Sequence, residues 1–90
     1  MAAKRYLIRG RVQGVGYRYF AQRTAQRFGV NGFARNLPGG DVEVHAEAET
    51  RTLQLFKEAL ARGPRMSDVT EIVERDVPDS GLYSSFLIRG

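Results

Sequence analysis

The residues most suited to chemistry lie near the amino terminus, where positions 10–18 read Gly-Arg-Val-Gln-Gly-Val-Gly-Tyr-Arg. Glycine loses more conformational freedom on folding than any other residue, so Gly14 and Gly16 need a structural reason. A glycine loop that leads into a helix presents backbone N–H groups and the positive end of the helix dipole to an anion, most often phosphate. Arg18 can pair phosphate oxygens two at a time. The stretch therefore predicts an anion-binding loop, although the glycines alone equally fit a tight connection without a ligand.

This loop differs from two familiar nucleotide-binding loops. A P-loop ends in Gly-Lys followed by Ser or Thr, whereas here Gly16 is followed by Tyr17 and Arg18. The dinucleotide-binding pattern requires a third glycine, and Tyr19 occupies that position. Neither of these nucleotide-binding motifs fits the loop.

Hydrophobic periodicity predicts the elements that would position this loop. Alternation of period two predicts strands, and apolar residues at helical spacing predict helices. The expected strands cover 5–12, 30–37, 41–49, 69–77 and 83–89, and the expected helices lie around 20–28 and 53–60. The order β-α-β-β-α-β predicts an α+β, ferredoxin-like sandwich. We expect a mainly antiparallel sheet, two helices on one face and a short extra strand at the carboxy terminus.

Length and composition place the chain among small globular domains. Its 90 residues fit a single domain, 1–90, and it contains no cysteine and one histidine, so a zinc site is not expected. No apolar run is long enough for a signal peptide or a membrane span, which favours a cytoplasmic protein without membrane contact. The net charge of +4 permits an anionic partner but is equally typical of a solvated basic surface. We expect a monomer.

Two stretches resemble the signatures of a known family. Residues 10–18 resemble the first signature of the acylphosphatase family, and residues 32–42, Gly-Phe-Ala-Arg-Asn-Leu-Pro-Gly-Gly-Asp-Val, resemble its second signature at the expected distance. The resemblance covers essentially the whole chain. It departs from the family at Ala48, where glycine is usual, and at Tyr17, where phenylalanine is most often found. Because Ala48 falls at the far end of a strand, we expect an adjustment of packing and no loss of activity.

The resemblance implies hydrolysis of acyl phosphates to a carboxylate and inorganic phosphate. It implies that Arg18 binds the phosphoryl group and that Asn36 positions the attacking water; without the resemblance, Asn36 would be read as a local hydrogen-bonding residue. It further implies that backbone N–H groups of a substrate phosphate-binding loop contact the phosphate. That loop consists of Gln13, Gly14, Val15, Gly16, Tyr17 and Arg18.

Elementary chemistry agrees with this set of residues. The leaving carboxylate has a pKa of about 4, so it needs no general acid. The reaction then requires charge stabilisation and orientation, as phosphoryl transfer does in general. We therefore expect no metal and no cofactor. The expected partners are a small-molecule acyl phosphate, and inorganic phosphate or sulfate as product or inhibitor.

The alternatives are a small anion-binding or RNA-binding ferredoxin-like module without catalysis, and an inactive regulatory relative. An RNA-binding module of this fold needs exposed aromatic residues on its first and third strands. Here the outward positions of the third strand are Glu43, His45 and Glu47, which we expect to form a solvated ionic face opposite Arg9 and Arg11. This pattern disfavours nucleic acid, and we expect no catalytic role for His45.

Overall fold

The computed structural model describes all residues from 1 to 90 and has seven elements of secondary structure. They follow the predicted order β-α-β-β-α-β with a final short strand, so the α+β ferredoxin-like fold is confirmed. The last strand is shorter than predicted: it begins at Phe86, whereas the sequence pattern predicted a beginning at residue 83. The elements are β1 (Ala2–Arg11), α1 (Tyr17–Phe28), β2 (Asn31–Asn36), β3 (Val42–Ala48), α2 (Thr50–Arg62), β4 (Asp68–Val77) and β5 (Phe86–Arg89).

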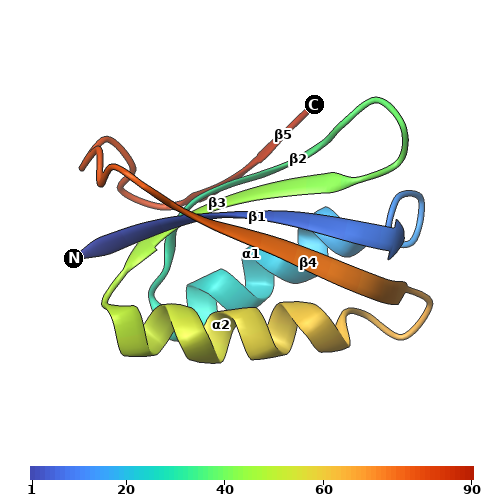
Figure 1. The fold of residues 1–90 in the computed structure, drawn as a ribbon, viewed down its shortest axis with the longest axis horizontal. Coiled ribbons are helices and arrows are strands. Elements are labelled where there is room, and N and C mark those ends of the chain that lie inside the picture. Colours follow the sequence, from blue (N-terminus) through green and yellow to red (C-terminus); the bar gives the residue numbers. More distant parts are fainter.

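The five strands form one sheet in the order β4-β1-β3-β2-β5. Every neighbouring pair is antiparallel except β2 and β5, which run parallel. Both helices cover the same face of this sheet (Figure 1). Arg11 and Asn36 are the last residues of β1 and β2. They lie at the same end of the sheet, because both strands run antiparallel to β3.

The core lies between the sheet and the helices, as the alternating pattern predicts. Tyr6, Ile8 and Val12 on the first strand segment are each at most 1% exposed. Two buried tyrosines place their polar ends on α2: the Tyr6 hydroxyl donates to the carbonyl oxygen of Leu53 at 3.3 Å, and the Tyr17 hydroxyl donates to that of Leu60 at 2.6 Å. Since Tyr17 opens α1, its hydrogen bond fixes the beginning of that helix against α2.

The opposite face of the sheet differs from the predicted solvated ionic face. Glu43 is 6% exposed and Glu47 is 2% exposed, so both carboxylates are buried. Glu43 accepts from Arg5 and from Arg35, which lie on the strands flanking β3. The predicted pairing with Arg9 and Arg11 is wrong, because Arg9 instead lies 3.6 Å from carboxylate oxygens of Asp41 and Glu71.

Glu47 is covered by the segment between β4 and β5. Its carboxylate accepts from the His45 ring at 2.8 Å and from both the backbone N–H and the hydroxyl of Ser80. Burial alone would raise the pKa of Glu47, but these hydrogen bonds outweigh it and lower the pKa to about 2. His45 also stacks on Phe33, with ring centroids 5.5 Å apart and an interplanar angle of 10°. It belongs to a packed cluster and not to a solvated face.

No helix in the structure is both long enough and apolar enough to cross a membrane.

Candidate active site

The loop between β1 and α1 has the geometry that its glycines predict. Gly14 and Gly16 adopt φ angles of 76° and 78°, in the left-handed region that favours glycine. A Cβ atom at either position would meet nothing within 4 Å, so the backbone conformation, and not crowding by the protein, is what requires glycine. Gly16 is the residue that caps α1, and no side chain hydrogen-bonds to that helix end.

Backbone donors of this loop are available to a ligand. Of the nine backbone hydrogen bonds outside helices and strands, none is donated by residues 13–16. The first N–H groups of a helix also lack partners within the helix, and α1 has no acidic residue in its first turn. The loop and the beginning of α1 therefore bring unpaired backbone donors and the positive end of the helix dipole together.

The Gln13 side chain fixes this loop and does not face the same cleft. Its Nε2 atom donates to the carbonyl oxygens of Leu37 and Asp41, both at 2.8 Å. These carbonyls belong to the turn between β2 and β3, which is close to Asn36. Gln13 thus joins the two sequence signatures, and this contact was not predicted. The backbone N–H of Gln13, by contrast, donates no hydrogen bond within the protein.

Arg18 and Asn36 meet in a cleft of about 200 Å³ at the end of the sheet. The cleft is lined by the loop glycines and by Arg18, Asn36 and Ile88 among others. Arg18 is half-buried and lies in the first turn of α1, whereas Asn36 is the last residue of β2. The fold therefore brings together the two side chains that the sequence predicted for one site, although 17 positions separate them.

The orientation of Arg18 depends on the carboxy terminus. Its Nη1 atom donates to the carbonyl oxygen of Arg89 at 2.7 Å. No hydrogen bond or ion pair joins Arg18 to a carboxylate, so its charge is not neutralised by a neighbour. The carboxamide of Asn36 makes no hydrogen bond with the protein. The Asn36 carboxamide and the remaining N–H groups of Arg18 are thus available to a ligand.

Comparisons with known proteins show which family the chain belongs to. The acylphosphatase family model matches residues 4–88. The chain belongs to the acylphosphatase family. It is 51% identical over 87 residues to an acylphosphatase of Solibacter usitatus, and the aligned region covers 97% of this chain and 90% of that protein. It is 39% identical over 89 residues to an acylphosphatase of Pasteurella multocida, with 99% of both chains covered.

A solved structure is also closely similar. The crystal structure of acylphosphatase from Bacillus subtilis superposes on the whole chain with a TM-score of 0.95 at 37% sequence identity, and 100% of both chains is covered. Members of this family are hydrolases that act on acyl phosphates, and this chain is an enzyme of that class.

The departures from the family pattern add no polar side-chain group to the cleft, although Tyr17 is among the residues that line it. Ala48 is the last residue of β3 and pairs with Ala2, whereas Asn36 pairs with Val42 at the other end of the strand. Tyr17 places its ring in the core, where it is 1% exposed, and burial raises the pKa of its hydroxyl. Neither residue presents a side-chain polar group to the ligand loop.

Proposed function

We propose that the enzyme cleaves the carboxyl–phosphate bond by in-line attack of a water molecule that Asn36 positions. The phosphoryl group would be held by Arg18 and by backbone N–H groups of the 13–18 loop. The observation that supports this proposal is the meeting of Arg18, Asn36 and unpaired loop donors in one cleft of about 200 Å³. The products are a carboxylate and inorganic phosphate.

Each group has a separate task in this mechanism. The loop and Arg18 bind the phosphoryl oxygens, and they bind them more tightly as charge is redistributed in the transition state. The carboxamide oxygen of Asn36 can accept a hydrogen bond from the attacking water, and its NH2 group can donate one to the water oxygen. The carboxylate leaves without protonation because it is a weak base, and the phosphoryl oxygens can take the proton of the attacking water.

No carboxylate or histidine is needed as a general base. His45 is bound to Glu47 on the opposite face of the sheet and does not line the cleft. No group of three histidine, cysteine, aspartate or glutamate side chains is arranged to hold a metal ion. The proposed mechanism therefore uses only orientation and fixed positive charge.

Two substitutions test the division of labour. Arg18→Ala should weaken competitive inhibition by phosphate and also lower kcat, because Arg18 contacts the anion in both the ground state and the transition state. Asn36→Ala should leave phosphate inhibition nearly unchanged while kcat falls by about a hundredfold or more, as for the loss of one transition-state interaction. Benzoyl phosphate is the substrate, and circular dichroism verifies folding.

Controls for this experiment separate the proposal from general damage. Arg18→Lys keeps the charge but cannot pair two oxygens at once, so it should also lose most activity. An alkyl phosphomonoester should be turned over little or not at all, and EDTA should leave acyl phosphate hydrolysis intact. If Asn36→Ala loses phosphate inhibition as strongly as Arg18→Ala, or keeps full kcat, then Asn36 does not position the water.

A further inference from the structure

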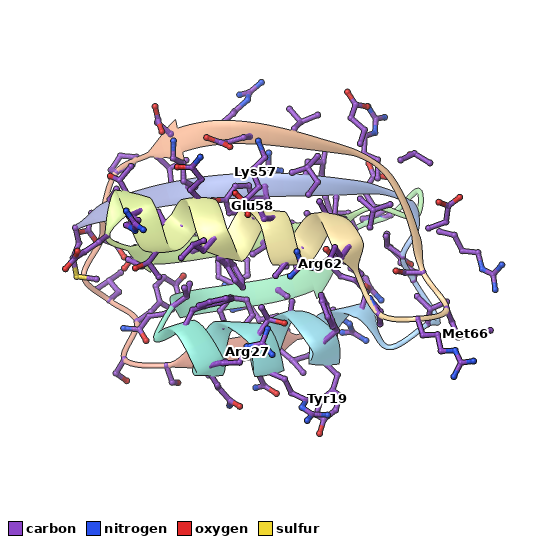
Figure 2. The ribbon with its side chains drawn as sticks, turned by 90° about the horizontal axis from the view of Figure 1, so that it is seen from below. Tyr19, Arg27, Lys57, Glu58, Arg62 and Met66 are labelled. Atoms are coloured by element: carbon purple, nitrogen blue, oxygen red, sulfur yellow. The ribbon has the colours of Figure 1, made fainter.

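A second hollow adjoins the catalytic cleft. Its volume is about 560 Å³, and it lies along α1 and reaches Pro64, which follows α2. Figure 2 shows the molecule from its helix side, with Tyr19 near the loop end of α1 and Arg27 farther along the same helix. We call this hollow the arginine groove, after two of its lining residues, Arg23 and Arg27.

The arginine groove adjoins the catalytic cleft. Gly16 and Tyr19 line both, so the two hollows meet at the loop that is proposed to hold the phosphoryl group. Asn36 and Arg18 line only the catalytic cleft. A molecule bound at the loop can therefore have one end near Asn36 and extend past Tyr19 into the groove.

The groove carries positive charge that the protein does not neutralise. Arg23 and Arg27 are exposed, neither forms an ion pair, and no aspartate or glutamate lines the groove. Their close partners are aromatic rings: the Arg23 guanidinium carbon is 5.6 Å from the centre of the Tyr19 ring, and that of Arg27 is 5.3 Å from the centre of the Phe28 ring. These contacts hold the side chains but leave their N–H donors free for an anion.

Three other arginines of the chain lie next to carboxylates. Arg5 and Arg35 both bind the buried carboxylate of Glu43, and Arg9 lies near two carboxylates. Arg51 also has no ion pair, but it does not line the groove, so the position of Arg23 and Arg27 is what distinguishes them. In the groove, two successive positions on one face of α1 are without such a partner and lie next to the site.

The stereochemistry of the reaction directs the acyl group toward this groove. In-line displacement requires the attacking water and the leaving oxygen to lie on opposite sides of phosphorus. The proposed water lies on the side of Asn36, so the leaving carboxylate lies on the side of phosphorus that faces away from Asn36. The hollow that adjoins the loop at Gly16 and Tyr19 without including Asn36 is the arginine groove.

We infer that the arginine groove binds the acyl group, and that it favours acyl phosphates whose acyl group bears an additional carboxylate or phosphate. Tyr19 would contact the acyl chain or ring, and Arg23 would pair the remote anionic group. Tyr19 and Arg23 are four residues apart, roughly 6 Å along the helix axis, a span that a benzene ring or a short aliphatic chain covers. This inference rests on the proposed function and names its substrate class.

A matched pair of substrates tests the inference. Benzoyl phosphate and 4-carboxybenzoyl phosphate differ only in a remote carboxylate. The wild-type enzyme should show kcat/KM about tenfold higher for the carboxylated substrate, as one charge-assisted hydrogen-bonded contact would give. Arg23→Gln should remove most of this preference while changing kcat/KM for benzoyl phosphate by less than about twofold. Competitive inhibition by inorganic phosphate should not change.

The control variant is Arg51→Gln. Arg51 is also exposed and without an ion pair, but it lies in the first turn of α2, at the opposite end of that helix from Pro64. The substitution makes the same change in net charge, so it corrects for long-range electrostatics. If Arg23→Gln does not fold by circular dichroism, Arg27→Gln replaces it, with a smaller loss of preference expected.

Two results would overturn the inference: no preference for the carboxylated substrate in the wild type, or an equal effect of Arg23→Gln and Arg51→Gln on that preference. Failure of the proposed function looks different, because it appears in Asn36→Ala, which would then keep full kcat or lose phosphate inhibition whatever the preference between the two substrates. In that case the groove is tested by isothermal titration with terephthalate and benzoate. Terephthalate should bind more tightly than benzoate to the wild type, whereas Arg23→Gln should bind the two equally. Equal binding of the two ligands by the wild type would overturn the inference.

Discussion

The carboxy-terminal strand holds the proposed phosphate-binding arginine in place. The carbonyl oxygen of Arg89 accepts from Arg18, and the Arg89 guanidinium carbon lies 4.2 Å from the centre of the Phe33 ring. The side chain therefore anchors the end of β5 to β2, and the backbone orients Arg18. Two perturbations separate these contributions. Removing residues 89 and 90 deletes the carbonyl, whereas Arg89→Ala keeps it and deletes the anchor.

The magnitude follows from the kind of contact that each change removes. A hydrogen bond from a charged group contributes about 1.5–3 kcal/mol, which corresponds to about 10- to 100-fold in an equilibrium constant. The truncated enzyme should lose kcat/KM by that factor, and its inhibition constant for phosphate should rise. Loss of a cation–π contact at an exposed site is about 0.5–1 kcal/mol, so Arg89→Ala should lose less than about fivefold.

The assay measures kcat/KM for benzoyl phosphate and competitive inhibition by phosphate in both variants. The truncated chain is prepared with a carboxy-terminal amide, because a free carboxylate on Ile88, a residue that lines the cleft, would add a negative charge beside it. Circular dichroism and thermal melting verify that the sheet is intact. A truncated enzyme with wild-type kcat/KM and phosphate inhibition would refute the positioning role of the carbonyl. An equal loss in Arg89→Ala would assign that role to the side chain instead.

Three further outcomes are expected. Phosphate at 100 times its dissociation constant should stabilise the fold by about 2.7 kcal/mol, and a melting temperature that does not move at matched ionic strength would contradict a phosphate site. Because the pKa of Glu47 is lowered to about 2, its ionised form contributes stability above pH 4.5, and this stability is lost as the pH falls toward 2. In urea titrations, the free energy of unfolding of Glu47→Gln should therefore fall less over this pH range than that of the wild type. His45→Ala should keep most of its activity, and a hundredfold loss in a folded variant would show that a catalytic group was overlooked.

The fold was predictable because its core obeys local rules. Alternation placed Tyr6, Ile8 and Val12 on one face of the first strand, and these residues are buried against the helices. The proposed site was predictable for a different reason. A glycine loop that precedes a helix has a known affinity for anions, and the two signatures allowed Asn36 to be assigned to the same site.

The burial of the acidic residues on β3 was not predictable in this way. Alternation tells which residues share a face, but it does not tell whether that face is covered. Glu43 is buried because Arg5 and Arg35, on the two neighbouring strands, close over it. Burial alone would raise the pKa of Glu43, and the two guanidinium groups outweigh this and lower it. The covering depends on strand order, which a pattern of hydrophobicity does not contain.

The contact between Arg89 and Arg18 could not be predicted either, because it also depends on strand order. This contact links the two faces of the molecule. The segment that covers Glu47 through Ser80 leads directly into β5, which pairs with β2 and ends beside Arg18. Glu47, on the face of the sheet opposite the helices, therefore anchors the chain segment whose end orients Arg18. A strand added in parallel at the edge of the sheet is what allows this, since an antiparallel β5 would carry its carboxy terminus away from the end of β2 at which Asn36 lies.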